Sequence, residues 1–474
     1  MLFSSTTFLF LFLPVMLLGY HGVLRGMRRE QNLFLLAGSL FFYAWGEPWF
    51  VLVMLCSIAV NYNLGLWAHR VHREHRYPDT VIRTALAVNL SLLFVFKYLT
   101  FTLENLELLG FHPVIPIIHL PIGISFFTFQ ALSYVIDVAK GRAQVQRDPL
   151  YVGLYISFFP QLIAGPIVKY SDIAAQIESR QDTWADFSAG ATRFVIGLSK
   201  KVLLSNQLAL VADRAFHLGG GSLPAAYAWL GSLCYTLQIY YDFSGYSDMA
   251  IGLGSMFGFH FLENFRYPYC AASITDFWRR WHISLSSWFR DYVYIPLGGS
   301  RTRKASGTVR NLFIVWLLTG LWHGANWTFV AWGLFYFVLL TLEKFRGLGV
   351  GWPVGLRRVF TFLMVNFGWV LFRADSLAEG WSYLLAMFGA NGFFSAQAGL
   401  FLRENAVILF FSFLFMVPFV PWLRARLEVL QNTGVKLLPS LLALVSAVLL
   451  TLLLLVSICY LVKGTYNPFI YFNF

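Results

Sequence analysis

The feature that most constrains this chain is an apolar run, Asn311–Leu342, with no Asp, Glu, Lys or Arg and a single histidine, His323. Charged residues, Arg310 and Glu343, flank the run. One membrane crossing needs about 20 residues, so the run is too long for a single helix. Glycines interrupt it within residues 320–324. We therefore expect two crossings, or one broken helix, that meet at His323.

The composition points to a membrane protein. Of 474 residues, 58% are hydrophobic and 12% are charged, whereas soluble domains average about 25% charged residues. The net charge of +12 does not indicate nucleic-acid binding, because the basic residues lie in short loops between apolar runs. We expect an all-α polytopic membrane protein with about 11–13 transmembrane helices, plus re-entrant or interfacial helices, in a single domain over residues 1–474.

The loop charges predict an orientation. Basic residues follow the first, third and fifth expected spans, at Arg28, Arg73 and Arg142, and the loops between them lack Lys and Arg. The positive-inside rule then puts the N-terminus outside the cytoplasm. It also makes the basic loops 301–310 and 344–358 cytoplasmic, with the turn after His323 in the outer half of the membrane.

The stretch Thr275–Arg301 has the pattern of an amphipathic helix. Thr275 is a candidate N-cap, and at helical spacing His282 shares a face with Trp278 and Leu285. One interpretation is a helix at the membrane interface, with aromatic anchors and a structural histidine. A catalytic role for His282 is the alternative.

The stretch Tyr235–His260 is apolar but carries Asp242, Ser244 and Asp248 around Gly245. We expect a helix break there, which a membrane tolerates only where protein buries it or where it lines a wet cavity. These residues are structural hydrogen-bonding groups, or else a carboxylate pair that binds a cation or orients a polar substrate. The preceding stretch, 187–213, mixes basic and apolar residues and is expected to lie at the interface.

His323 has two interpretations. A structural histidine would be neutral and hydrogen-bonded inside the bundle, for example to Asn326. A functional histidine would be a general base, because a neutral imidazole accepts a hydroxyl proton near pH 7 and burial keeps it neutral. No serine-nucleophile elbow, HExxH, Walker or GxGxxG motif accompanies it, and the four scattered cysteines suggest no metal site.

Three motifs resemble the membrane-bound O-acyltransferase family, and most of all its bacterial branch, which includes the alginate O-acetylation membrane protein and the D-alanyl transfer protein of teichoic acid modification. The likeness covers nearly the whole chain, with core motifs over residues 119–345, and the alginate wording is nearer. The three motifs are DFSGYSDMAIG from Asp242, FWRRWHISLSSWFRDYVYIPLGG from Phe277 and GLWHGAN from Gly320; weaker matches are LPIGISF from Leu120, FPQLIAGP from Phe159, Arg373-Ala374 and PFIYF from Pro468.

The resemblance implies a fold, a reaction and partners. It implies a ring of tilted helices around a central tunnel in the bacterial inner membrane. His323 matches the near-invariant histidine of the family and His282 its second active-site position. An acetyl group from a cytosolic donor, acetyl-CoA used as substrate with no permanently bound cofactor, would cross the membrane to an exopolysaccharide such as alginate or cellulose. Expected partners are membrane lipid and periplasmic acetyltransferases of the SGNH-hydrolase type, with no nucleic acid.

The predicted site combines both lines of reasoning. Catalysis is assigned to His323 and His282. A transporter for a polar solute and a non-catalytic scaffold of a polysaccharide secretion complex remain alternatives. The expected tunnel-lining residues are Asp242, Ser244, Tyr246, Asp248, Trp278, Trp322 and Asn326, and the expected donor-binding residues are Arg279, Arg280, Arg301, Arg303 and Lys304, which can attract CoA phosphates.

Overall fold

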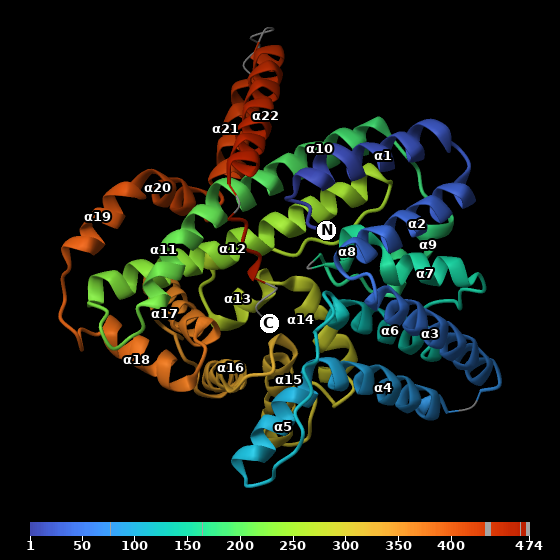
Figure 1. The fold of residues 1–474 in the computed structure, drawn as a ribbon, viewed down its shortest axis with the longest axis horizontal. Coiled ribbons are helices and arrows are strands. Elements are labelled where there is room, and N and C mark those ends of the chain that lie inside the picture. The colour runs from blue at the N-terminus through green and yellow to red at the C-terminus, as the bar shows by residue number, and fades with distance from the viewer. Residues whose placement is uncertain (76, 164, 432–437, 465, 471–474) are drawn as a thin grey trace. The chain divides into compact units, whose positions relative to one another are not determined.

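A computed structural model describes the chain except for residues 76, 164, 432–437, 465 and 471–474, so Tyr471 and Phe472 of the last motif lie outside it. The described residues form helices and no strand, which confirms the all-α prediction (Figure 1). The helices are α1 (Leu13–Leu18), α2 (Arg28–Gly46), α3 (Phe50–Arg73), α4 (Asp79–Leu93), α5 (Leu99–Leu108), α6 (Ile124–Ala139), α7 (Pro149–Ser157), α8 (Phe159–Leu162), α9 (Tyr170–Glu178), α10 (Trp184–Ser199), α11 (Asn206–His217), α12 (Ala225–Met256), α13 (Ile274–Arg280), α14 (Ile283–Phe289), α15 (Ala305–His323), α16 (Trp327–Arg346), α17 (Val354–Arg373), α18 (Leu377–Met387), α19 (Ala396–Glu404), α20 (Ala406–Phe415), α21 (Phe419–Gln431) and α22 (Leu438–Lys463).

The helices confirm a polytopic membrane protein, but fewer of them are long and apolar enough to span than expected. Among the described residues six pass by length and composition, or seven if the bent pair α19–α20 is one span. The difference arises because other apolar runs fold into short helices, such as α6 with 16 residues and α7 with nine. The six candidates are Phe50–Arg73, Asp79–Leu108, Trp184–His217, Trp327–Arg346, Val354–Arg373 and Pro439–Lys463. The third includes 187–213, whose interfacial position stays a prediction.

The chain forms two compact units. Unit 1 contains Met1–Phe194 and Ser247–Glu263, and unit 2 contains Val195–Tyr246 and Asn264–Phe474. One boundary between the units lies within α10, after Phe194, and another lies within α12, after Tyr246. Each of these continuous helices therefore contributes residues to both units. The prediction of one domain over the whole chain stays a prediction.

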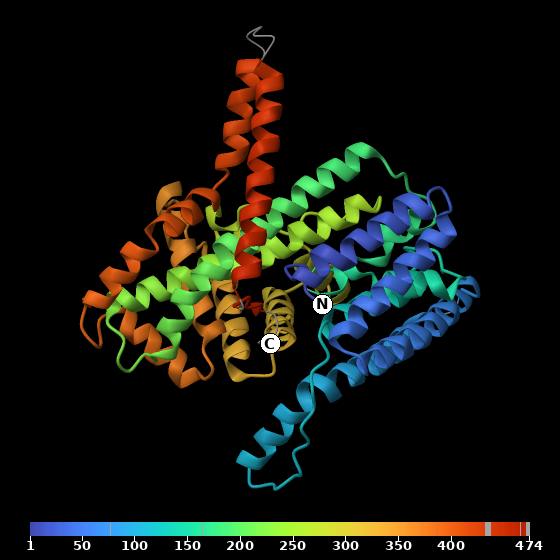
Figure 2. The ribbon, with the colours of Figure 1, turned by 45° about the horizontal axis from the view of Figure 1, so that its top comes forward.

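Unit 1 is built around α6. All 16 residues of this helix are buried, and α3, α4, α7 and α9 pack against it. Its sequence, ISFFTFQALSYVIDVA, is mostly apolar on every face, which is typical of a helix enclosed by others. In Figure 2, α4 and α5 follow one another as a blue-to-cyan rod, in keeping with one apolar span over Asp79–Leu108.

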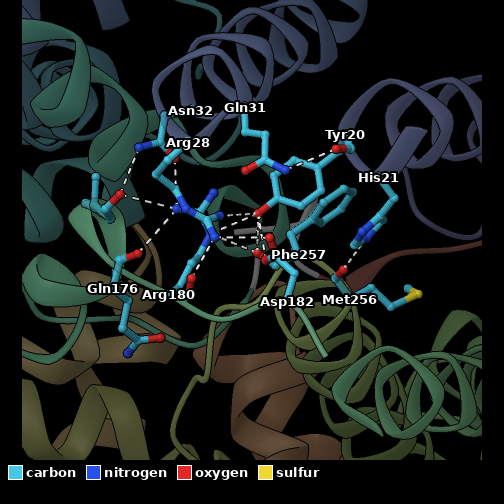
Figure 3. A network of polar contacts seen from close by, with 11 residues as sticks. Tyr20, His21, Arg28, Gln31, Asn32, Gln176, Arg180, Asp182, Met256 and Phe257 are labelled. Carbon is cyan, nitrogen blue, oxygen red and sulfur yellow. Dashed lines mark hydrogen bonds and ion pairs between the residues drawn. The ribbon is translucent and has the colours of Figure 1, made fainter. Parts of the chain in front are cut away.

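A polar network ties distant segments of unit 1 together (Figure 3). The buried Tyr20 hydroxyl accepts hydrogen bonds from Arg28 Nη1 at 2.8 Å and from Arg180 Nε at 3.0 Å. It lies 3.0 Å from both Asp182 Oδ1 and the Phe257 carbonyl oxygen, to which it can donate. Arg28 also pairs with Asp182 at 3.0 Å. The network joins the N-terminal helices to the end of α12.

Unit 2 is organised around the antiparallel hairpin of α15 and α16. The two helices touch through glycines: a Cβ on Gly320 would lie 2.4 Å from the Phe329 carbonyl oxygen, and one on Gly333 would lie 2.4 Å from that of Trp316. This confirms that two helices meet beside His323, where α15 ends. Elsewhere in unit 2, α21 and α22 lie side by side in both views (Figures 1 and 2), and α22 is almost entirely exposed, as a lipid-facing helix would be.

The expected break at Asp242–Gly245 is wrong, because α12 is continuous from Ala225 to Met256. Asp242 is fully buried and pairs with Lys201 at 2.5 Å, which removes the cost of an unpaired charge in the helix. Its Oδ2 also accepts a hydrogen bond from the Ile470 amide at 2.9 Å, while Lys201 donates to the Pro468 carbonyl. The pair therefore holds the end of the described chain.

Candidate active site

The helix expected from Thr275 is two helices, because the chain breaks at Trp281 and His282. Ser273, and not Thr275, caps α13 by accepting from the Asp276 amide at 3.1 Å. The Glu343 carboxylate, from the far end of α16, also accepts from the first amides of α13. His282 has a left-handed backbone, with φ 44° and ψ 55°, and directly precedes α14. The break turns His282 into the interior of unit 2.

His282 is a buried and neutral histidine. Its Nδ1 lies 3.3 Å from Asn264 Oδ1 and 3.4 Å from Ser284 Oγ. Burial in an apolar environment, at the break between α13 and α14 and outside the six spanning helices, lowers the pKa of His282 to about 3. The imidazole can therefore serve as a hydrogen-bond acceptor near neutral pH.

Trp322 contacts both predicted catalytic histidines. Its ring centroid is 6.2 Å from that of His282 and 5.0 Å from that of His323. His323, half-buried at the last position of α15, also packs edge-on against Trp332 at 4.9 Å and Phe372 at 5.2 Å. The structure thus brings both histidines into contact with one indole ring.

Two cavities of unit 2 lie toward opposite ends of the α15–α16 hairpin. The first, which we call the basic-end cavity, has about 500 Å³ and lies toward the end where α15 begins and α16 finishes. The second, the turn-end cavity, has about 350 Å³ and lies where the hairpin turns. The basic-end cavity is lined by Thr275, Trp278, Arg279, Leu285, Ser286, Phe289, Arg290, Tyr294, Leu312, Val315, Trp316, Thr319, Leu340, Glu343 and Lys344, and the turn-end cavity by Asp213, Tyr235, Gln238, Asn326, Thr328, Phe329, Phe372, Arg373, Ala374, Asp375, Pro468 and Ile470.

Aromatic rings connect both cavities to the histidines. Trp278, on the basic-end cavity, lies 5.6 Å from Trp332, which touches His323. On the other side, Phe372 lines the turn-end cavity and also touches His323. His323 therefore lies one aromatic ring from the turn-end cavity and two from the basic-end cavity.

Three buried polar side chains line the turn-end cavity. Tyr235 Oη, Gln238 Oε1 and Thr328 Oγ1 are buried atoms that find no hydrogen-bond partner within the part of the chain that the structure describes. Buried polar groups normally have partners, so this cavity suits water or a hydroxyl-bearing group. Asn326 is positioned beside it by its own bonds, since its Oδ1 caps α16 and its Nδ2 donates to the Asp375 carbonyl.

The expected donor-binding residues divide into two groups. Arg279 lines the basic-end cavity, whereas Arg280 is held by Asp276 at 2.8 Å. Exposed side chains at the basic end of the hairpin, between α14 and α15, are Arg301, Arg303 and Lys304. Lys344 of the cavity donates to Ser300 at 2.7 Å. These charges lie at one end of the hairpin, and their role in binding the acyl donor stays a prediction.

The residues of the DFSGYSDM motif do not surround the histidines as a group. Asp242, Ser244 and Tyr246 are buried in α12 within unit 2, and Asp242 forms an ion pair with Lys201. Asp248 belongs to unit 1, where it pairs with Arg193 at 2.9 Å. Their tunnel-lining role stays a prediction, as does that of Trp278, Trp322 and Asn326.

The sequence profile of the membrane-bound O-acyltransferase family matches residues 2–377. The chain belongs to the membrane-bound O-acyltransferase family. As a member of it, the protein is a multi-pass membrane-bound O-acyltransferase, which agrees with the all-helical fold.

Relatives of this O-acyltransferase modify several polymers. The chain is 45% identical to the "probable alginate O-acetylase" of Pseudomonas aeruginosa, over 82% of this chain and 75% of that protein. It is 34% identical to the peptidoglycan O-acetyltransferase of Helicobacter pylori, over 100% of this chain and 98% of that protein. It is 32% identical to the teichoic acid D-alanyltransferase of Bacillus subtilis, over 53% and 68%. Acyl transfer is common to these names, and the polymer differs.

Sequence reasoning missed several residues of the acyltransferase site. Asn264 and Ser284 hold His282, and Trp332 and Phe372 enclose His323. The signal for Ser284 was its position two residues after His282. Trp332 lies in the same apolar run as His323 but on the next helix, and Asn264 and Phe372 come from segments distant in the sequence, so no local pattern linked these three to the histidines.

Proposed function

We propose that this protein passes an acetyl group from a cytosolic thioester, acetyl-CoA, across the bacterial inner membrane for O-acetylation of an exopolysaccharide such as alginate or cellulose. The observation that carries the proposal is the His282–Trp322–His323 group, together with cavities toward both ends of the hairpin that bears His323. Such an arrangement suits a transfer enzyme, because separate cavities can admit the donor and the acceptor to one base.

The proposed reaction is a simple acyl transfer. His323 accepts the proton of an acceptor hydroxyl, whose oxygen attacks the thioester carbonyl carbon. The carbon–sulfur bond breaks, and the leaving thiolate takes up the proton, which returns His323 to its neutral form. The aromatic residues around His323 keep water from the thioester, so that hydrolysis does not compete.

The charges support a cytosolic donor. Lys344 and Arg279 line the basic-end cavity, and Arg301, Arg303 and Lys304 lie at the same end of the hairpin. The positive-inside rule assigns this end to the cytoplasm, where CoA phosphates would meet basic side chains. The opposite, polar cavity would then receive the acceptor. Acetyl-CoA acts here as a substrate and not as a bound cofactor.

The relatives support a polymer as the final acceptor. Two of them are named for alginate and for peptidoglycan acetylation. We propose that a periplasmic acetyltransferase of the SGNH-hydrolase type takes the acetyl group and places it on the polymer, and that the surrounding partner is membrane lipid. Alginate or cellulose is the proposed polymer, and peptidoglycan is the alternative that the experiment separates.

The test is acetyl analysis of isolated polymers from a deletion strain that carries wild-type protein, His323→Gln or the control His112→Gln, at matched membrane levels. General-base catalysis typically contributes about 10²–10⁴-fold, so His323→Gln should lose nearly all acetylation of one polymer. His112 is exposed in the loop after α5, and its variant should match wild type. Near-normal acetylation by a folded His323→Gln protein would reject the catalytic assignment in favour of transport or scaffolding.

A further inference from the structure

Asn264 is a buried residue that the catalytic assignment does not use. It is 2% exposed and lies in the segment that runs beside the break between α13 and α14. Its backbone carbonyl accepts a hydrogen bond from the Ile283 amide at 3.0 Å, and two residues later the Arg266 amide donates to the Arg280 carbonyl at 2.9 Å. The segment 264–266 therefore binds both sides of His282 and fixes the break.

The side-chain oxygen of Asn264 is oriented by a backbone donor. Oδ1 accepts from the Ser284 amide at 3.1 Å and from Ser284 Oγ at 2.9 Å. Since a backbone N–H can only donate, the atom that faces it must be the oxygen and not the amide nitrogen. The same oxygen lies 3.3 Å from His282 Nδ1. An oxygen acceptor at this place favours a proton on Nδ1, because the Ser284 hydroxyl, 3.4 Å from Nδ1, makes its shorter bond of 2.9 Å to Asn264.

We propose that Asn264 is a positioning residue that holds His282 in the Nδ1–H tautomer, so that Nε2 is the atom that accepts a hydrogen bond from the reacting hydroxyl. The inference rests on the proposed function, because it gives His282 a place in the same reaction. The tautomer of a histidine is set by the bond that its other nitrogen makes. Asn264 makes that bond to His282, while Ser284 keeps the Asn264 oxygen in place.

A neutral amide suits this task better than a carboxylate. A carboxylate against Nδ1 would stabilise the imidazolium and would raise the pKa of His282, whereas an amide fixes the tautomer and leaves the ring neutral. Arg280, two residues from His282, pairs with Asp276, and the His323 ring contacts the same Trp322 ring that contacts His282. Substitution of Asn264 should therefore change the pH dependence of the reaction and not only its rate.

The experiment compares three variants in membrane vesicles supplied with radiolabelled acetyl-CoA, with label transferred to the polymer measured from pH 5 to pH 9. Asn264→Asp keeps an acceptor for Nδ1, so transfer above pH 8 should stay within about tenfold of wild type, while the acid limb moves to higher pH. Asn264→Leu should lose about 10²-fold or more at every pH. The control is His112→Gln, at an exposed residue in the loop after α5, and it should stay near wild type.

A merely structural role makes a different prediction. Asn264→Asp and Asn264→Leu would then lose activity together, with lower thermal stability in detergent and an acid limb that does not move, and this result would overturn the proposal. A second readout does not need activity: in ¹⁵N-histidine-labelled protein, the resonances assigned to His282 by their loss in His282→Gln should show a protonated Nδ1 and an unprotonated Nε2. The reverse pattern would also overturn it.

The two proposals fail in distinguishable ways. Full transfer by His323→Gln would remove the proposed function, whatever Asn264 does. Loss of transfer in His323→Gln combined with normal transfer in His282→Gln would leave the proposed function in place and would remove the role of Asn264 alone.

Discussion

His282 is one of three non-glycine residues with a positive φ among the described residues, together with His75 and Tyr267. A left-handed backbone costs an L-residue about 1–2 kcal/mol, and such residues persist where the surrounding structure holds them. Tyr267 directly follows Arg266, and His282 lies between Arg280 and Ile283, whose backbones pair with Arg266 and Asn264. The paired segments thus hold two strained residues, one of which is a predicted catalytic group.

The burial of His282 predicts acid sensitivity. Its pKa is lowered to about 3 in the folded protein, against an ordinary value of 6.5 in the unfolded chain. Between these values the unfolded chain binds the extra proton, so the free energy of unfolding rises with pH and falls as acid is added below pH 6.5. Asparagine tolerates a left-handed backbone, so His282→Asn is a suitable variant. Its free energy of unfolding, followed by thermal unfolding in detergent, should fall less than that of wild type between pH 6.5 and pH 5.

The exposed His112 supplies the control for this measurement. His112→Asn should lose stability with acid as wild type does, because that side chain stays in contact with solvent in both states. Equal acid sensitivity of wild type and His282→Asn would contradict the buried neutral state of His282.

At the scale of single elements, sequence periodicity identified α15 and α16 and their meeting beside His323, because an uncharged run of this length leaves few alternatives. It failed at His282, since the spacing of Trp278, His282 and Leu285 fits one continuous helix equally well. The break is decided by Asn264, 18 positions earlier in the sequence. It failed also at Asp242, whose burial depends on Lys201 from another helix.

The glycine of the DFSGYSDM motif is explained by helix packing. A Cβ on Gly245 would lie 2.8 Å from the Gly197 carbonyl oxygen and 3.1 Å from the Lys201 amide. We therefore expect that Gly245→Ala lowers the melting temperature and membrane yield, because α12 must move away from this neighbour. A bulky Gly245→Leu substitution, which would probe a tunnel wall, should fail to fold instead of blocking passage.

The matched control is Gly399→Ala in α19, where an added Cβ meets nothing within 4 Å. Alanine is favoured over glycine inside a helix by about 1 kcal/mol, so this variant should be as stable as wild type or slightly more stable. A melting temperature for Gly245→Ala that equals that of Gly399→Ala would show that α12 has room at Gly245.

At the scale of the whole molecule, loop charge predicts the topology. The third span ends at Arg73, and the apolar segment Asp79–Leu108 carries Glu104 near its far end. Single cysteines at these two positions, in a background without the four native cysteines, can be treated with an impermeant thiol reagent in intact spheroplasts. The position of Glu104 should be labelled and that of Arg73 should not. Labelling of position 73 alone would reverse the orientation, and with it the sides assigned to donor and acceptor.

The division into two units has a consequence for synthesis. Unit 1 consists of Met1–Phe194 and the later stretch Ser247–Glu263, and Tyr20 reaches its carbonyl partner Phe257 only in that stretch. A ribosome adds about 5–20 residues per second, so the first 194 residues wait several seconds for the segment that completes them. Throughout this interval Arg180 and Tyr20 lack the Phe257 carbonyl, and the nascent chain depends on the insertion machinery to shelter them. Chains that end at Phe194 should therefore be degraded faster than chains that end at Glu263 in a pulse-chase measurement.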